Sequence, residues 1–432
     1  ADGKTLEVLA RGLRQPFIGV HPKTGMVTSS DQQGNYIPST PLHIIKGDGR
    51  FYGFIPTFLP KEQYPAPIED PLTWIPHVVN ASAATQVWLT DAKMGPLNNG
   101  LIHLGYNRPE LFLVRMHERA SRPHAAVISM MREIPYGLLN GSVNPKDGQL
   151  YVAGFKVFGC SAPRISGLGR FRYTGAPSHL PTEVVAMDKG VLLRFDEPVD
   201  EGSISTTNFV VQRWNYRRSA QYGSPHLKLD GTPGQETMPV ASTYLSRDKR
   251  SVFIGVPDMK PVMQMTVYWK LASNGVPFEP TAAFTPHELV PFDSSREGFG
   301  TVSVDLAVKP AASAPAMASA NVEPSAAEGR KLYEMLGCIA CHSTDGSMAG
   351  KVGPSWRGLA GTRREMSDGS IVEVDDAYLR ESILQPSAKV PKGFQNLDAG
   401  MPIYEGVLNE QQIRSLILYI KSLADMPTVS AR

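Results

Sequence analysis

The sequence has only three cysteines among 432 residues, too few for a scaffold held together by disulfides. It also has almost no excess of one charge, because 43 Lys and Arg residues face 41 Asp and Glu residues and leave a formal net charge of +2. This balance gives no reason to expect nucleic acid or an anionic membrane as a partner. No run approaches 18 apolar residues, so we expect no membrane-spanning helix.

Turn-forming residues are abundant instead. The 39 glycines and 36 prolines favour many turns and short strands over long helices. Hydrophobic residues make up 42% of the chain, which is enough for several packed cores, and about 150 residues per domain predicts roughly three domains. The chain begins at Ala1 and not at Met, so we expect that a signal peptide has been removed or that this is a fragment.

A change of composition divides the chain. Residues 309–324 read KPAASAPAMASANVEP, and this Ala, Pro and Ser tract predicts a semi-extended linker. The linker separates a C-terminal unit, residues 325–432, from a β-rich remainder. Within that remainder, residues 181–308 contain short apolar runs divided by turns, which predict an immunoglobulin-like antiparallel β-sandwich.

The first unit, residues 1–180, contains a weak internal repeat. A Pro-Lys-x-Gly turn followed by an apolar run occurs within residues 21–35 and again within residues 144–158. A turn-and-strand unit that recurs in an all-β region favours the blades of a β-propeller. At about 40–45 residues per blade the segment holds about four blades, so we expect an incomplete, β-propeller-like segment.

The most specific chemical signal is the run Cys338-Ile339-Ala340-Cys341-His342, which has the C-x-x-C-H pattern of c-type haem attachment. In this pattern each thiol forms a thioether with a haem vinyl group, and the adjacent histidine is an axial ligand of the iron. A zinc site would need a second pair of ligands, and a thioredoxin-like redox pair would need a βαβ setting. The sequence therefore predicts one covalent haem c.

The second axial ligand follows by elimination, because no histidine occurs after His342 and methionine is then the expected strong ligand. Met348 is too close to His342 to reach the other face of a porphyrin, Met366 lies in an expected hairpin turn, and Met426 follows the last expected helix. Met401 lies farther downstream in an irregular stretch, so we predict it as the ligand, with a core-filling side chain as the alternative. Ligation by His and Met leaves no open position for substrate and favours electron transfer.

Metal-bound histidine usually donates its second ring N–H to an oxygen acceptor. In the pair Gly353-Pro354 we expect the carbonyl of Pro354 to accept this hydrogen bond from His342, and a surface turn is the alternative. Three helices are expected around the motif. Residues 325–328 form a capping box for the first, Asp376 is expected to cap the middle one, and Asn409 the last.

Residues 325–425 resemble class I c-type cytochromes. The resemblance implies a small all-α fold around the haem, with a close crossing of the terminal helices at Gly329 and Tyr419 packed there. Because covalent haem attachment follows export, it also implies a periplasmic or extracellular location. The matching positions are Gly329, Tyr333, Cys338, Cys341, His342, Gly353, Pro354, Tyr378, Ile383, Pro386, Gly393, Phe394, Met401, Pro402 and Tyr419.

Residues 1–308 resemble the C-terminal part of cytochrome-fused sugar or sorbosone dehydrogenase-like proteins. The stretches that carry this resemblance include ARGLRQPFIGVHPKTG and MREIPYGLLNGSVNPKDGQLYVAGF. The family implies a quinoprotein-type β-propeller, an immunoglobulin-like domain and pyrroloquinoline quinone (PQQ) as a cofactor. Its further blades would lie on a second polypeptide or in a removed part of a precursor.

Two functions remain open from the sequence. The chain is expected to be the haem-bearing subunit or portion of a quinoprotein-like sugar or alcohol dehydrogenase, passing electrons to a redox partner protein. The alternative is a non-catalytic electron-transfer protein whose β domains only dock a redox partner. No residue of the chain can be named as catalytic.

Three further groups of side chains allow either a function or ordinary packing, and we interpret each as packing. The groups are His103, His117 and His124 as a substrate pocket, Trp214, Tyr216, Tyr222 and His226 as an aromatic sugar platform, and Cys160 as a reactive thiol.

Overall fold

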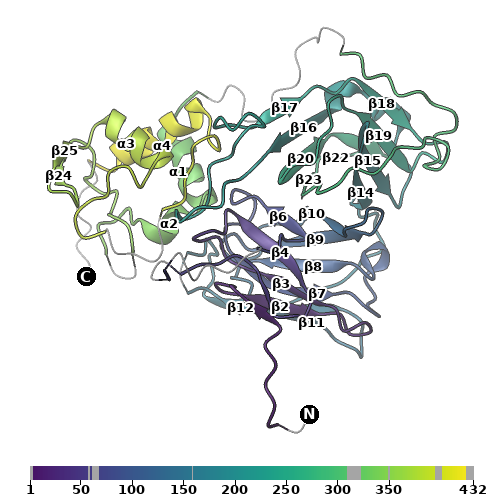
Figure 1. Cartoon of the computed structure of the whole chain (residues 1–432), viewed down its shortest axis with the longest axis horizontal. Coiled ribbons are helices and arrows are strands. Elements are labelled where there is room, and N and C mark those ends of the chain that lie inside the picture. The colour runs from purple at the N-terminus through teal and green to yellow at the C-terminus, as the bar shows by residue number, and fades with distance from the viewer. Residues whose placement is uncertain are drawn as a thin grey trace.

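Strands dominate the first three hundred residues, and the longer helices follow residue 325 (Figure 1). The computed structural model describes residues 3–56, 59–60, 68–157, 159–308, 323–348, 351–394 and 401–424. Most of the expected linker, residues 309–322, lies outside the described residues. No helix in the described ranges is long and apolar enough to cross a membrane.

The strands form several sheets, whose pairing is antiparallel except between β1 and β5. The first large sheet has the order β2-β3-β4-β6, with strands Phe17–Val20, Val27–Ser30, Thr40–Ile45 and Thr73–Ile75. The largest has the order β17-β16-β20-β23-β10-β9-β8-β7, with strands Glu236–Met238, Phe209–Trp214, Gln264–Trp269, Thr281–Phe284, His124–Met131, Glu110–His117, Leu101–Gly105 and Ala83–Trp88. A three-stranded sheet consists of β11 (Asn140–Val143), β12 (Leu150–Phe155) and β13 (Ser166–Phe171). A four-stranded sheet has the order β14-β15-β19-β18, with strands Pro181–Met187, Gly190–Phe195, Ser251–Gly255 and Ser242–Leu245. The short pairs are β1 (Ala10–Arg11) with β5 (Arg50–Phe51), β21 (Leu271–Ser273) with β22 (Val276–Phe278), and β24 (Arg363–Glu365) with β25 (Ile371–Glu373).

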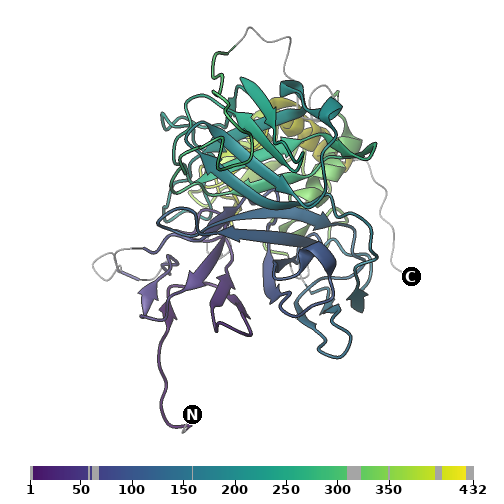
Figure 2. The same cartoon turned by 90° about the vertical axis from the view of Figure 1, so that its right-hand side faces the viewer.

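The repeated turn of the first unit joins the strands of two hairpins. One turn connects β2 to β3 and the other connects β11 to β12. In each, a glycine with a positive φ closes the turn, Gly25 at +72° and Gly148 at +71°, and its N–H donates to the carbonyl four residues earlier. The sequence repeat therefore corresponds to a repeated hairpin. Figure 2 shows these strands as two groups below the green sheets.

The largest sheet joins the first and second expected units. Strand β10 pairs with β23, so that Val127 lies opposite Ala283. This sheet shares one apolar core with the sheet that contains β15 and β19. Trp269 on β20 contributes from the largest sheet, and Val191 and Val252 contribute from the other. The mostly β character of this region is confirmed, whereas the propeller-like and immunoglobulin-like details and the boundary at residue 180 remain predictions.

The C-terminal unit is helical, as predicted. Its helices are α1 (Ala326–Met335), α2 (Cys338–Cys341), α3 (Asp376–Leu384) and α4 (Glu410–Ser422). The expected crossing of α1 and α4 is present, because a Cβ on Gly329 would lie 1.9 Å from the carbonyl oxygen of Ser415. The expected hairpin is present as β24 and β25.

Two of the three predicted helix caps are confirmed and one is shifted. Asn409 forms a reciprocal capping box with Gln412. The Ser325 hydroxyl accepts the N–H of Glu328, which confirms the cap, but the N–H of Ser325 donates to the Ser415 hydroxyl, so only half of the predicted capping box at residues 325–328 is present. The cap of α3 is Asp375, and Asp376, which we predicted, is its first helical residue. Adjacent aspartates look alike in a sequence, whereas only Asp375 has the extended backbone that a cap requires.

Candidate functional site

The cysteine motif occupies a single helical turn. Helix α1 ends before Gly337, whose φ of +75° turns the chain directly into α2. Cys338 and Cys341 are the first and last residues of that turn, and both are half-buried. Burial first, and then the neighbouring Cys341, raise the pKa of Cys338 to about 12, so this thiol is uncharged at neutral pH.

His342 is fixed by hydrogen bonds on its ring and its backbone. Its Nδ1 lies 2.8 Å from the carbonyl oxygen of Pro354, the acceptor that the sequence predicted. The Tyr333 hydroxyl donates to the carbonyl oxygen of His342 at 2.6 Å. Burial is the main cause that lowers the pKa of His342 to about 4, so the ring is neutral at pH 7. With Nδ1 occupied, Nε2 is the nitrogen available to a metal.

Gly353 forms a cradle for the His342 ring. A Cβ at position 353 would lie 2.6 Å from Cε1 and 2.8 Å from Nδ1 of His342, closer than side chains normally approach. The N–H of Gly353 also donates to the carbonyl oxygen of Cys341 at 2.9 Å. The backbone therefore wraps around the ring and leaves it one orientation.

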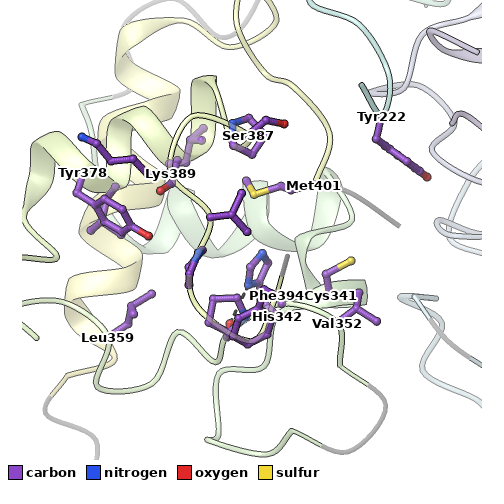
Figure 3. A pocket seen from close by; sticks show the side chains of 18 of the residues that line it. Tyr222, Cys341, His342, Val352, Leu359, Tyr378, Ser387, Lys389, Phe394 and Met401 are labelled. Atoms are coloured by element: carbon purple, nitrogen blue, oxygen red, sulfur yellow. Dashed lines mark hydrogen bonds between the residues drawn. The ribbon is translucent and has the colours of Figure 1, made fainter. Parts of the chain in front are cut away.

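A cavity of about 630 Å³ opens beside this ring. Cys341 and His342 line one side, and Met401 lines it as well (Figure 3). Most of the remaining wall is apolar and comes from Val352, Leu359, Leu379, Ile383, Pro391, Phe394 and Ile420. The volume lies within the roughly 300–1,000 Å³ typical of cofactor sites. One thiol, a neutral imidazole and a thioether line this apolar cavity, and the second thiol, Cys338, lies in the same helical turn as Cys341; this set fits a covalently bound haem c.

Among the four candidate methionines, the structure brings only Met401 into the cavity with His342, within the described residues. Met366 is buried in the core, where its sulfur lies 3.9 Å from the Tyr378 hydroxyl. Met348 is 46% exposed, and Met426 lies outside the described residues. The residues just before Met401, 395–400, are also outside them. The ligand role of Met401 remains a prediction.

Two cations also line the cavity, Arg364 and Lys389. The Arg364 guanidinium lies 6.0 Å from the centre of the Phe394 ring, and the Tyr378 side chain lines the cavity as well. These groups could hold the anionic substituents of a bound cofactor. No local signal in the sequence pointed to them, because the fold brings together Arg364 on β24 and Lys389 in the segment after α3.

The structure also adds a residue from the β-rich region to the cavity. Tyr222 lines its wall, together with Asn35 and Gln221 (Figure 3). From the sequence Tyr222 was one of four aromatic side chains interpreted as packing. No spacing rule could relate it to Cys341, because the two residues meet only through the tertiary fold.

The remaining candidates have packing environments. Trp214 and Tyr216 belong to one buried cluster, and the His226 ring stacks on Trp214 at 4.5 Å. His103 is buried, with Nε2 2.6 Å from the side-chain nitrogen of Asn80. The rings of His117 and His124 lie 5.1 Å apart on paired strands, and Cys160 is a buried free cysteine.

Comparison with known proteins identifies the C-terminal region. A family model described as cytochrome c matches residues 326–424. Cytochrome c2 of Blastochloris viridis is 32% identical over 116 residues, which cover 24% of this chain and 84% of that protein.

Solved structures give a weaker likeness. A glucose dehydrogenase has a TM-score of 0.30 at 17% identity, covering 40% of this chain and 48% of that one. A structure from Thermus thermophilus, also described as a glucose dehydrogenase, has a TM-score of 0.28 at 20% identity, covering 38% and 46%. The chain thus spans about half the length of these dehydrogenases.

Proposed function

The chain belongs, through residues 326–424, to the cytochrome c family, and on this premise we propose that it transfers electrons through one haem c bound to Cys338 and Cys341. Haem c with imidazole and thioether ligands takes up and releases single electrons without an open coordination position. The observation that carries the proposal is the shared cavity of Cys341, His342 and Met401, with the His342 ring fixed by Pro354.

The side chains around the cavity have distinct tasks in this proposal. Cys338 and Cys341 supply the two sulfurs for covalent attachment. His342 offers Nε2 to the iron, while Pro354 accepts from Nδ1 and so fixes the tautomer and raises the basicity of the ring. Met401 would supply the second protein ligand of the iron. The apolar wall excludes water, which strengthens every electrostatic interaction inside the cavity.

Covalent attachment and ligation can be tested separately. Cys338→Ser should weaken or abolish covalent haem, because one of the two thioether bonds cannot form, and haem staining of a denaturing gel reports this loss.

Met401→Ala should retain covalent haem but lose the near-red sulfur–iron band and lower the midpoint potential, because the thioether ligand is gone. The control is Met348→Ala, which removes an exposed methionine. If the band persists in Met401→Ala, another residue is the ligand. If the wild-type protein carries no covalent haem, the proposed function is wrong.

For the β-rich region we propose the role implied by its resemblance, the haem-bearing part of an extracytoplasmic quinoprotein-like sugar or alcohol dehydrogenase. PQQ would be the cofactor of the oxidation, and a propeller-like segment followed by an immunoglobulin-like sandwich would be the architecture. The repeated hairpins at Gly25 and Gly148 support the first part of this architecture. Quinone-dependent sugar or alcohol oxidation by the purified chain, alone or with a partner, tests the proposal.

We also propose that a second polypeptide, or a further part of a longer chain, completes the propeller. Two edge strands support this. Ile18 and Val20 on β2 are 58% and 53% exposed, and Leu168 on β13 is 72% exposed, although edge strands usually avoid exposed apolar side chains. Native mass spectrometry would detect the second polypeptide and count bound cofactors. A complex with no quinone and no oxidation activity would favour the alternative, β domains that only dock a redox partner.

A further inference from the structure

The cavity has a second, smaller compartment on the side of the cysteines. It measures about 240 Å³ and lies between the helical unit and the β-rich region. Cys338, Cys341, His342 and Met401 line it from the helical side. Side chains of the β-rich region line it from the other side, and they include Arg14, Gln32, His77, Asn107 and Tyr222. The edge that bears the thioethers therefore faces this chain's own β-rich region.

Tyr222 is held in place by backbone pairing with an early segment of the chain. Asn35 and Tyr222 form an isolated antiparallel bridge, and the side-chain amide of Asn35 donates to the carbonyl of Ala220 at 2.5 Å. The N–H of Gly223 donates to the carbonyl of Gly34 at 3.2 Å. Gly223 has a φ of +76°, and a Cβ there would collide with a neighbouring side chain at 2.1 Å. This loop is thus fixed closely against the early segment.

Arg14 supports the ring of Tyr222. Its guanidinium lies 5.4 Å from the centre of that ring, a cation–π distance, and Nη1 donates to the carbonyl of Gln33 at 3.3 Å. The backbone N–H of Arg14 donates to the carboxylate of the fully buried Asp31 at 2.7 Å. The side chain of Arg14 crosses over Gly34, because a Cβ at position 34 would lie only 2.7 Å from Cδ of Arg14. Backbone and side chain are therefore both positioned.

The helical unit approaches the β-rich region closely at two glycines. A Cβ on Gly337, directly before the cysteine motif, would lie 2.8 Å from the side-chain nitrogen of Asn107. A Cβ on Gly406 would lie 2.4 Å from the backbone nitrogen of Gly234. Both glycines have a positive φ, so a larger residue would strain the backbone as well as the contact. Because Gly337 and Asn107 both line the smaller compartment, their contact leaves no space for a separate protein at that edge.

We propose that Arg14 and Tyr222 form the wall of the haem cavity at its thioether edge, so that this edge is an internal contact and not a docking surface for a soluble redox partner. The inference rests on the covalent haem of the proposed function, but not on any substrate. Arg14 and Tyr222 are positioning residues. Tyr222 excludes water and external reagents, and the positive charge of Arg14 favours the reduced state, which carries one positive charge fewer.

The role of Tyr222 is tested by the access of a small oxidant. In Tyr222→Ala, oxidation of the reduced haem by ferricyanide in stopped flow should become at least tenfold faster, whereas Tyr222→Phe, which keeps the ring, should stay within twofold of wild type. The matched control is Tyr268→Ala on the sandwich strand β20, where the hydroxyl donates to Glu279. If Tyr222→Ala carries covalent haem and reacts within twofold of wild type, the inference is wrong.

The role of Arg14 is tested by the midpoint potential of the haem. This measurement also tests the inference if Tyr222→Ala does not fold. Arg14→Gln should lower the equilibrium constant of haem reduction at least threefold, and a tenfold change corresponds to 59 mV for one electron. Arg11→Gln removes the same charge from an exposed side chain that donates to Gly49, and should leave the midpoint unchanged. Equal midpoints in both variants would overturn the inference. Absence of covalent haem from the wild type would instead overturn the proposed function.

Discussion

The substitution Gly353→Ala tests the close contact between the backbone at Gly353 and the ring of His342. The new Cβ would lie 2.6 Å from Cε1 of the ring, whereas ordinary contacts begin near 3.4 Å, so the ring must retreat by about 0.8 Å. Gly353 does not have a positive φ, and the substitution therefore adds no backbone strain. The displaced ring cannot keep its 2.8 Å hydrogen bond to Pro354.

Loss of such a supporting hydrogen bond typically costs ~10–100-fold in metal affinity, which is about 1.4–2.7 kcal/mol. We expect Gly353→Ala to retain covalent haem on a stained gel but to lose part of its low-spin visible spectrum and to show a raised midpoint potential, because the ring becomes a weaker electron donor. The control is Gly202→Ala, where an added Cβ meets no atom within 4 Å. Identical spectra and midpoints in the two variants would refute the reasoning.

Two further predictions concern stability. In Gly329→Ala the new Cβ would lie 1.9 Å from the Ser415 carbonyl oxygen, so α1 and α4 must separate; overpacking costs about 1–3 kcal/mol, against ~1 kcal/mol gained in helix propensity. Urea unfolding should show net destabilisation, and a stabilised variant would contradict the crossing. Burial, and then Arg218, lower the pKa of His43 to about 3, so its stability contribution is complete above pH 6.5 and is lost as the pH falls toward 3. His43→Gln should therefore reduce the loss of unfolding free energy between pH 7.5 and pH 5 by about 2 kcal/mol, and an undiminished loss would count against this assignment.

The lowered pKa values of three buried histidines have the same main cause, which is burial. His43, His103 and His226 are at most 2% exposed, and burial lowers the pKa of each to about 3. Each is neutral in the folded protein and takes up a proton on unfolding in mild acid. We therefore expect the β-rich region to be sensitive to acid well above the pH at which its carboxylates are protonated.

Local features of the helical unit could be predicted from the amino-acid order alone. The spacing of Cys338, Cys341 and His342 specifies haem attachment because it lies within a single turn. Caps such as Ser325 and Asn409 and the repeated Pro-Lys-x-Gly turns were also predictable, because each depends on atoms only a few residues apart. Glycine at position 329 pointed correctly to a close helix crossing, although only through the family resemblance.

Which distant residues meet depends instead on tertiary packing. The pairing of β10 with β23 joins two regions that the pattern of strands and turns had assigned to separate units, because strand pairing depends on shape and core packing over long sequence distances. The same holds for Tyr222 and Arg14, which reach the cavity through a bridge to Asn35 and contacts across glycines. Local chemistry is set by neighbours along the chain, whereas the wall of a cavity is set by the packing of whole sheets and helices.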